Sequence, residues 1–94
     1  MEPIRYAAAA CQTDLPNPRD RSEMRANTDR MLEMIDAAVA GSAPFLPVRL
    51  VVFPEFAHAA PAYATVAELL DRLAVPIPNE HTDRLARAAR RHQI

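Results

Sequence analysis

The sequence predicts an α/β protein with a β-α-β-α arrangement and a parallel sheet. Two short apolar segments, residues 4–12 and 49–53, flank one long amphipathic segment, and two further helical patterns follow. Strands that alternate with helical segments form βαβ units, in which the strands run parallel and the crossover is right-handed. Because parallel sheets are buried on both sides, we expect helices to cover both faces of this sheet.

The first apolar segment is ambiguous on local grounds. Its four alanines, residues 7–10, favour a helix by intrinsic propensity. Its short length, ahead of a loop that contains Pro16 and Pro18, is typical of a buried parallel strand, and periodicity does not separate the two. On the basis of this length we interpret residues 4–12 as a strand.

The second segment carries the clearest helix signals in the chain. Asp20 and Glu23 have the spacing of a capping box, which satisfies free backbone donors and predicts a helix that begins near Arg21. Gly41, the only glycine, follows the last periodic residues, so we expect a left-handed residue there and a helix that ends near Ala40. One face carries an apolar stripe of Met24, Met31, Ile35 and Ala38.

A second buried strand and a short helix are predicted next. Residues 49–53 are rich in β-branched and aromatic side chains, and Pro54 ends the run. Thr65 and Glu68 repeat the capping-box spacing, which predicts a helix that continues to about Leu73.

The last helix is predicted after the proline-containing residues 75–78. Asn79 is a typical N-cap, and the helix that it opens is expected to carry Leu85 and Ala89 inward and to reach residues 91–92. The chain then stops where a third strand would begin, and two strands leave both edges of a sheet open. We therefore expect residues 1–94 to be the N-terminal fragment of a single larger domain.

The composition excludes several classes of protein. A net charge of −1, from eleven arginines and twelve acidic residues, gives no field that would hold nucleic acid or an anionic membrane. There is no membrane-spanning apolar run and no secretory signal, so we expect a cytoplasmic protein. With one cysteine, Cys11, and one glycine, no disulfide, cysteine-rich metal site or phosphate loop is expected, and no cofactor is predicted.

Glu55 is the strongest candidate for chemistry. It comes directly after the second strand, and ligands of open α/β sheets bind outside the carboxyl ends of the strands. Its neighbours Phe53, Pro54 and Phe56 are expected to desolvate the carboxylate, which favours its use as a general base. The alternative is structural: Glu55 caps the following turn or pairs with an arginine.

The order of the features along the chain points to a known family. The features are a first strand that ends at residues 10–12, a loop with Asp14 and Asn17, a helix with Asn27 and Arg30, the run Leu50-Val51-Val52-Phe53-Pro54-Glu55, and the helical residues 79–92. In this order they resemble the start of the nitrilase superfamily of carbon–nitrogen hydrolases. The resemblance covers nearly the whole chain, and its most specific part is the run that ends in Glu55.

This resemblance implies an α-β-β-α sandwich and a Glu-Lys-Cys catalytic triad, commonly with a second supporting glutamate. In the family a cysteine thiolate attacks a nitrile or amide carbon, and the thioimidate or thioester that forms is hydrolysed or passed to another acceptor. The glutamate is the general base, and the lysine stabilises the charge that develops at the attacked carbon. Glu55 matches the glutamate, so it is the one catalytic residue that the resemblance assigns here.

The other two members of the triad have no counterpart in the chain. The sequence contains no lysine, and Cys11 lies in the first strand, whereas the family's nucleophile follows a strand well downstream. Cys11 is therefore expected to be a small buried core residue. Since triad members act as a unit, the 94 residues alone are expected to be catalytically silent.

Two further residues are candidates for a substrate pocket. His58 lies three residues beyond Glu55, and Tyr63 lies where the family often has pocket-lining aromatics. Tyr63 is about equally open to interpretation as a packing residue, and for His58 the absence of a second histidine or cysteine at metal spacing favours a role without chemistry. The last helix is basic, and we interpret its arginines as a solvated face partnered by Glu80 and Asp83. No pair of histidines has the spacing of a metal site.

The resemblance thus implies a hydrolase for a small-molecule amide or nitrile, and it implies a homo-oligomer as the usual assembly of the family. The choice among nitriles, amides and ureido acids stays open. One alternative is a truncated or degenerate copy that acts as an interaction module through its open sheet edge. Another is an unrelated α/β fragment, such as half of a Rossmann-like domain, which the absence of a glycine-rich turn after the first strand disfavours.

Overall fold

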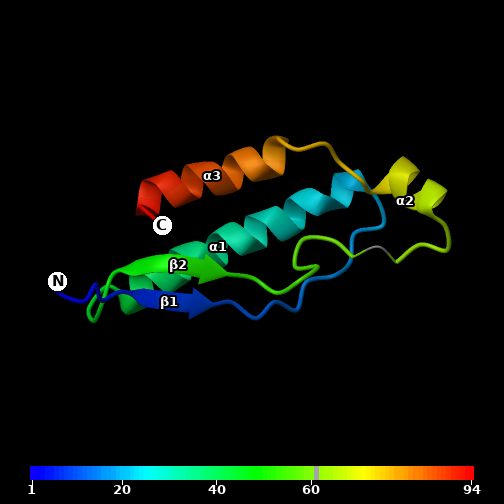
Figure 1. Ribbon diagram of the computed structural model, residues 1–94. Coiled ribbons are helices and arrows are strands. Elements are labelled where there is room, and N and C mark those ends of the chain that lie inside the picture. The colour runs from blue at the N-terminus through cyan, green and yellow to red at the C-terminus, as the bar shows by residue number, and fades with distance from the viewer. Residues whose placement is uncertain (61) are drawn as a thin grey trace.

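The computed structural model describes residues 1–60 and 62–94 and has a mixed α/β architecture (Figure 1). The elements are β1 (Ala7–Ala10), the single-turn 3₁₀ helix η1 (Arg21–Glu23), α1 (Met24–Ser42), β2 (Val48–Val52), α2 (Val66–Arg72) and α3 (Glu80–His92). This order confirms the predicted α/β class. None of the helices in the described residues is both long enough and apolar enough to cross a bilayer.

β1 and β2 pair in parallel, as predicted, although β1 is much shorter than the predicted 4–12. Ala8 lies opposite Leu50 and Ala10 opposite Val52. Beyond the strand, the Cys11 N–H donates to the Val52 carbonyl at 2.8 Å. The alanine run is a strand in spite of its helix propensity, because pairing with β2 satisfies its backbone groups and tertiary context overrides a weak local preference.

Helical structure begins at Arg21, as the Asp20 and Glu23 spacing predicted, but with the 3₁₀ turn η1, and α1 itself begins at Met24. The Asp20 carboxylate accepts a hydrogen bond from the Ser22 N–H at 2.9 Å. The Glu23 carboxylate accepts a hydrogen bond from the Arg19 N–H at 2.8 Å, whereas a capping box would have the Asp20 N–H as its donor. The predicted stripe is confirmed for its three largest side chains, which are the buried Met24, Met31 and Ile35.

The C-terminal end of α1 corrects the prediction for Gly41. The helix continues through Gly41 to Ser42, and the next residue, Ala43, keeps an ordinary right-handed conformation with φ −51°. The Ser42 carbonyl then accepts a hydrogen bond from the Phe45 N–H at 2.9 Å, so a tight turn reverses the chain. No left-handed glycine is needed, because this turn satisfies the end of the helix by itself.

The predicted caps of the last two helices are confirmed. Thr65 Oγ1 accepts from the Glu68 N–H at 3.2 Å at the start of α2. The Asn79 side chain accepts from two backbone amides in the first turn of α3. At its other end, α3 finishes with Gln93 in the left-handed conformation that usually favours glycine, with φ 57°.

Arg21 ties the short helix α2 to the beginning of α1. Its guanidinium donates to the carbonyls of Leu70 at 2.6 Å and Ala74 at 2.8 Å, and also to the carbonyl of Asp71. These carbonyls lie at the C-terminal end of α2, where helix carbonyls lack partners and a positive charge is favourable. The contact spans about fifty residues of sequence, so no local pattern indicates it.

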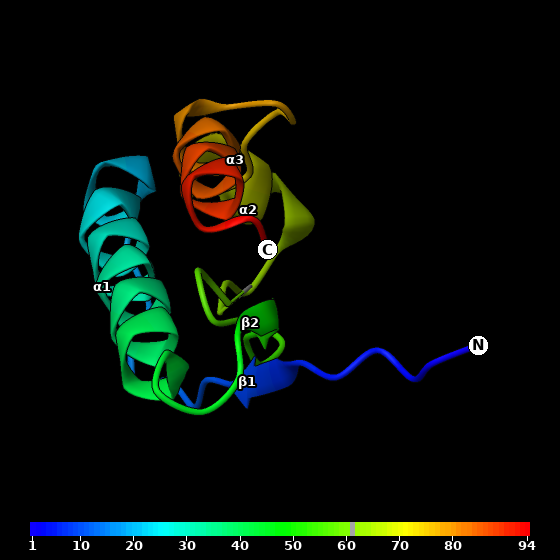
Figure 2. The same ribbon diagram turned by 90° about the vertical axis from the view of Figure 1, so that its left-hand side faces the viewer.

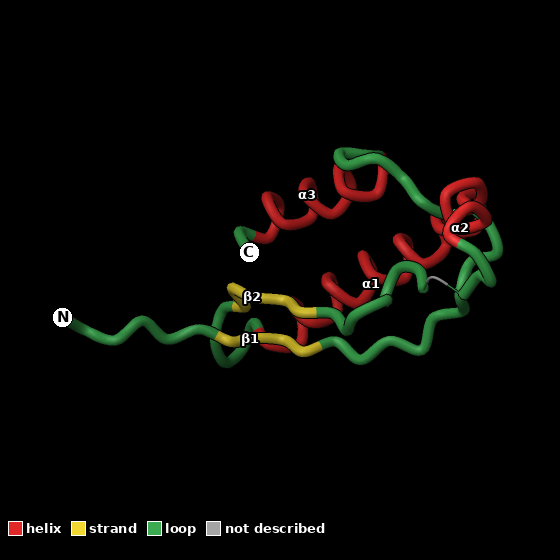
Figure 3. Tube along the Cα trace, turned by 45° about the vertical axis from the view of Figure 1, so that its right-hand side comes forward, coloured by secondary structure: helices red, strands yellow, loops and turns green. Residues whose placement is uncertain are grey.

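Helix α1 packs on one face of the two-stranded sheet, and α3 lies against α1, beyond β2 (Figures 2 and 3). Val51 is half-buried on the helical side. On the opposite face Ala8 and Ala10 are exposed, and Leu50 and Val52 keep 48% and 50% of their surface exposed. The prediction that helices cover both faces is therefore wrong for residues 1–60 and 62–94, and one apolar face of the sheet is open.

Ion pairs join α1 to α3 along their shared length. They are Arg25–Glu80, Arg84–Asp29 and Arg91–Asp36, and the His92 ring also forms a hydrogen bond with Asp36. The prediction that Glu80 and Asp83 partner the arginines of α3 is thus corrected, and Glu80 pairs with Arg25 on α1 at 3.0 Å. Exposed pairs contribute little individually, but their opposite charges fix how the two helices align.

Candidate functional site

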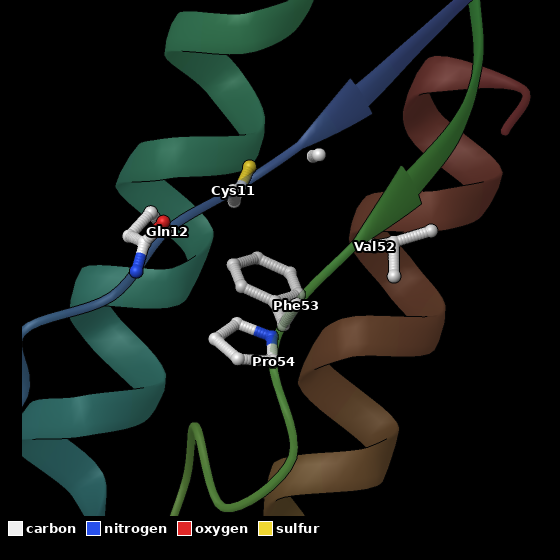
Figure 4. A pocket seen from close by; sticks show the side chains of 6 residues that line it. Cys11, Gln12, Val52, Phe53 and Pro54 are labelled. Atoms are coloured by element: carbon white, nitrogen blue, oxygen red, sulfur yellow. The ribbon is translucent and has the colours of Figure 1, made fainter.

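The carboxyl ends of β1 and β2 frame a shallow hollow of about 250 Å³. It is lined by Ala10, Cys11, Gln12, Val52, Phe53 and Pro54. In Figure 4 the rings of Phe53 and Pro54 face the strand that carries Cys11 and Gln12. Ligands of open parallel sheets bind at this end of the strands, and the walls here offer one thiol and one side-chain amide.

Cys11 lies at the wall of this hollow. It is a free thiol and is half-buried, so the expectation of a fully buried core residue is corrected. The alternation of side chains along an extended segment explains the difference. Cys11 continues the register of β1 just past its last residue, on the same side as Ala7 and Ala9, which are also only half-buried.

Glu55 lies in a tight turn immediately after β2. The Ala57 N–H donates to the Pro54 carbonyl at 3.1 Å, so Glu55 and Phe56 are the two central residues of the turn. Phe56 has φ 62°, a left-handed conformation that costs a residue with a side chain about 1–2 kcal/mol. Strain of this kind persists only where the surroundings hold the backbone in place.

The side chain of Glu55 is exposed to solvent. The expectation that its neighbours desolvate it is not met, because Phe56 itself keeps 58% of its surface exposed and Pro54 is exposed as well. Within the described part of the chain, the Glu55 carboxylate neither caps a turn nor pairs with an arginine. The structural alternative for this residue therefore has no support from these contacts.

His58 takes part in a buried polar cluster that no sequence pattern indicated. Its Nε2 lies 2.7 Å from Thr28 Oγ1, and the same oxygen lies 2.7 Å from Nδ1 of His81. Thr28 is fully buried and His81 is 5% exposed. The two imidazole rings meet edge to face with their centroids 4.7 Å apart. The cluster joins α1, α3 and the loop after β2.

The Thr28 hydroxyl has one proton, and its oxygen lies 3.3 Å from the Met24 carbonyl and 2.7 Å from one nitrogen of each ring. Oε1 of Glu80 lies 3.5 Å from Nε2 of His81 and favours a proton on that nitrogen, which leaves Nδ1 as an acceptor. Thr28 then donates to Nδ1 of His81 and accepts from the Nε2–H of His58. Burial, followed by the nearby charge of His81 when protonated, lowers the pKa of His58 below its ordinary 6.5.

Asn27 also holds the loop after β2 through hydrogen bonds. Its side-chain amide donates to the carbonyl of His58 at 3.0 Å and to the carbonyl of Pro16 at 2.9 Å. Two more bonds join the loops that follow β1 and β2: the Ala60 N–H donates to the Asn17 side chain at 2.7 Å, and Tyr63 donates to a backbone carbonyl. Both loops are thus held together at the end of the sheet.

Tyr63 contributes to this loop contact rather than to a pocket wall. Its hydroxyl donates to the Arg19 carbonyl at 2.6 Å, and the ring is half-buried. Neither Tyr63 nor His58 lines the hollow at the strand ends, and Glu55 does not line it either. Of the three predicted site residues, His58 and Glu55 share one loop, and Tyr63 helps to anchor the segment that follows.

Residues 1–60 and 62–94 contain no group of three histidine, cysteine, aspartate or glutamate side chains that could hold a metal ion. The arrangement can instead offer an exposed carboxylate, a half-buried thiol and a chain of hydrogen bonds that reaches the loop from two helices. Thr28, His81 and Asn27 are the residues that sequence reasoning missed as a set.

No protein-family model, curated protein or solved structure matches the chain.

Proposed function

We propose that this chain forms the N-terminal part of a carbon–nitrogen hydrolase and supplies Glu55 as its general base. One observation carries the proposal: the Glu55 carboxylate lies in the first turn after β2 and is open to solvent, at the carboxyl ends of two parallel strands. A base that takes a proton from a nucleophile or a water molecule has to be reachable from outside the sheet in this way.

The conformation of the turn is a second support. Phe56 adopts its left-handed conformation directly beside Glu55, and Asn27 and the cluster around Thr28 hold the loop a few residues further on. A backbone held under strain fixes the direction of the side chains that it carries, and such strain gathers at functional sites. Glu55 therefore belongs to a preorganised segment.

In this proposal the catalytic lysine and the nucleophilic cysteine lie outside the 94 residues. The chain has no lysine, and Cys11 directly follows the first strand. The open apolar face of the sheet is compatible with the second sheet of an α-β-β-α sandwich, since sheets pack through faces of this kind. The chain alone is expected to be inactive, and the substrate class is a small amide or nitrile.

The test begins with the coding sequence that follows Ile94. A lysine and a cysteine on a strand-to-helix turn are expected downstream, and the polypeptide that includes them is assayed for hydrolysis of short amides and nitriles. Glu55→Gln, which keeps the size of the side chain, is expected to abolish turnover. Glu2→Gln, at an exposed position near the N-terminus, is the matched control and is expected to retain it. Full activity of Glu55→Gln would overturn the proposal, and so would a coding sequence without the two residues.

A second candidate is a non-catalytic interaction module. The observation that favours it is the exposed apolar face formed by Ala8, Ala10, Leu50 and Val52, together with the unpaired edges of both strands. Under this alternative the 94-residue chain forms a stable complex or oligomer in size-exclusion chromatography, and Leu50→Glu disrupts it. A monomer whose mass does not change with concentration contradicts this alternative.

A further inference from the structure

The cluster of His58, Thr28 and His81 has no part in the chemistry proposed for Glu55, yet it contains Thr28 and His81, two of the three buried polar residues in the described part of the chain. It connects the loop that carries Glu55 to α1, across 30 residues of sequence, and α1 to α3, across 53 residues. Buried polar networks are sensitive to the loss of any one partner, because an unpaired buried group is costly. The protonation of such a network therefore affects everything attached to it.

We propose that His58, Thr28 and His81 form a proton-controlled latch that holds the Glu55 loop against α1 and α3 at neutral pH and releases it in mild acid. Its relevance to catalysis rests on the role proposed for Glu55. The latch itself is defined by the position of the loop, so the two proposals can fail separately.

The charges around the cluster decide which ring acts as the sensor. His81 has a counter-charge from the same helix, since Glu80 Oε1 lies 3.5 Å from its Nε2. Glu80 in turn is paired with Arg25 of α1 at 3.0 Å. The next pair between the two helices is Arg84–Asp29. Among these groups no carboxylate pairs with His58, whose neighbours on α1 are the Thr28 hydroxyl and the Met24 carbonyl.

A charge on the His81 ring would have a carboxylate beside it, because Glu80 Oε1 lies 3.5 Å from its Nε2, and Thr28 would have the Met24 carbonyl, 3.3 Å away, as its acceptor. A charge on His58 as well would put two like charges on rings whose centroids are 4.7 Å apart. His81 is fixed in the first turn of α3 and is nearly fully buried. His58 is the ring on a loop, so it is the one that leaves.

When the His58 ring leaves the cluster, the backbone hydrogen bonds of the loop around His58 are expected to weaken. The His58 carbonyl is held by Asn27, and the preceding turn depends on the bond from the Ala57 N–H to the Pro54 carbonyl. The Ala60 N–H, two residues further on, is held by Asn17. These two amides report on the loop without depending on any catalytic activity.

The test is hydrogen exchange of the Ala57 and Ala60 amides by NMR on the 94-residue chain, expressed as protection factors between pH 7.5 and 5. Since His58 has an ordinary pKa of 6.5 when released and a lower one in the latch, protection should be constant above pH 6.5. Below it, protection should fall by up to about tenfold per pH unit, the limit for one proton, and level off at the pKa of the latched ring. The amides of Met31 and Ile35 in the middle of α1 should keep their protection.

Two variants sharpen the result. His58→Gln keeps a nitrogen that can donate to Thr28 but does not titrate, so its protection should be independent of pH. His92→Gln removes a histidine that bonds Asp36 at the far end of α3, and it should leave the fall unchanged. The latch is refuted by protection that stays flat in the unmodified chain, by loop amides that are unprotected at pH 7.5, or by an equal fall in His58→Gln. A parallel loss at Met31 and Ile35 also refutes it, since this would be global unfolding.

Discussion

Thr28 offers the most direct test of the buried cluster, because one hydroxyl serves two imidazoles. Thr28→Val keeps the shape of the side chain and removes the hydroxyl. The change deletes the hydrogen bonds to Nε2 of His58 and Nδ1 of His81, both 2.7 Å long. It leaves Nδ1 of His81 without a partner at a position that is 5% exposed.

The expected loss of stability follows from these contacts. Two hydrogen bonds contribute about 1 kcal/mol each, and an unsatisfied buried nitrogen costs about 1–3 kcal/mol more, which gives about 3–5 kcal/mol for Thr28→Val. Thr28→Ser keeps the hydroxyl and removes one buried methyl group, which costs about 1 kcal/mol. The serine variant should therefore be the more stable, by about 2–4 kcal/mol.

Urea denaturation followed by circular dichroism measures this difference. With a slope of about 1–2 kcal/mol per molar urea, typical of a small chain, the midpoint of Thr28→Val should lie at least about 1 M below that of Thr28→Ser. Thr13→Val is the control, because Thr13 is half-buried and has no hydrogen bond to the described residues. A valine variant as stable as the serine variant would mean that packing alone holds position 28, and the hydrogen-bonded cluster would be refuted.

Three further outcomes are expected. Because Phe56 has φ 62°, Phe56→Gly should be about 1 kcal/mol more stable than Phe56→Ala in urea denaturation. On the exposed face of α3, Ala86→Gly should instead lose about 1 kcal/mol. If glycine stabilised or destabilised relative to alanine at both positions alike, the left-handed turn would be contradicted. Arg21→Met should destabilise by about 1 kcal/mol and reduce the helical signal of α2, and Arg21→Lys should recover only part of both, since one ammonium cannot reach three carbonyls. Hydrogen bonds from His92 and then from Arg91 hold the pKa of Asp36 below its ordinary 3.8, so the stability that Asp36 contributes is present above pH 3.8 and is lost as the pH falls through the lowered pKa. The free energy of unfolding measured against pH should lose this dependence in Asp36→Asn. An unchanged pH profile in that variant would contradict the assignment.

Local signals predicted most of the elements. Thr65 and Asn79 cap their helices as the sequence indicated, because a side-chain oxygen beside free amides is a local interaction that needs no other part of the chain. The buried Met24, Met31 and Ile35 follow from helical spacing in the same way.

The predictions that were wrong concern features that depend on contacts between segments distant in the sequence. Gly41 was expected in the left-handed conformation, yet Phe56 and Gln93 have it, because the loop contacts around Phe56 and the last turn of α3 impose it on side chains that tolerate it at a cost. Composition alone gives no access to such positions. The open face of the sheet was also missed, since the apolar character of Leu50 indicates burial but does not say what covers it.

The same distinction between local and long-range interactions applies to the candidate site. Glu55 was found from its place after a strand, which is a local property of the sequence. The cluster of His58, Thr28 and His81 was not found, because its members are separated by 30 and 53 residues and only the packing of α3 on α1 brings them together. Each histidine taken singly is uninformative.

The central claim is that Glu55 acts as a general base, and its most direct test is the ratio of kcat/KM for Glu55→Gln and the unmodified sequence. The measurement uses the polypeptide that also carries the expected lysine and cysteine, with a short amide as substrate. Loss of a general base is expected to lower kcat/KM by about 10²–10⁴-fold while Glu2→Gln leaves it unchanged. A Glu55→Gln enzyme with the same kcat/KM as the unmodified one would contradict the claim.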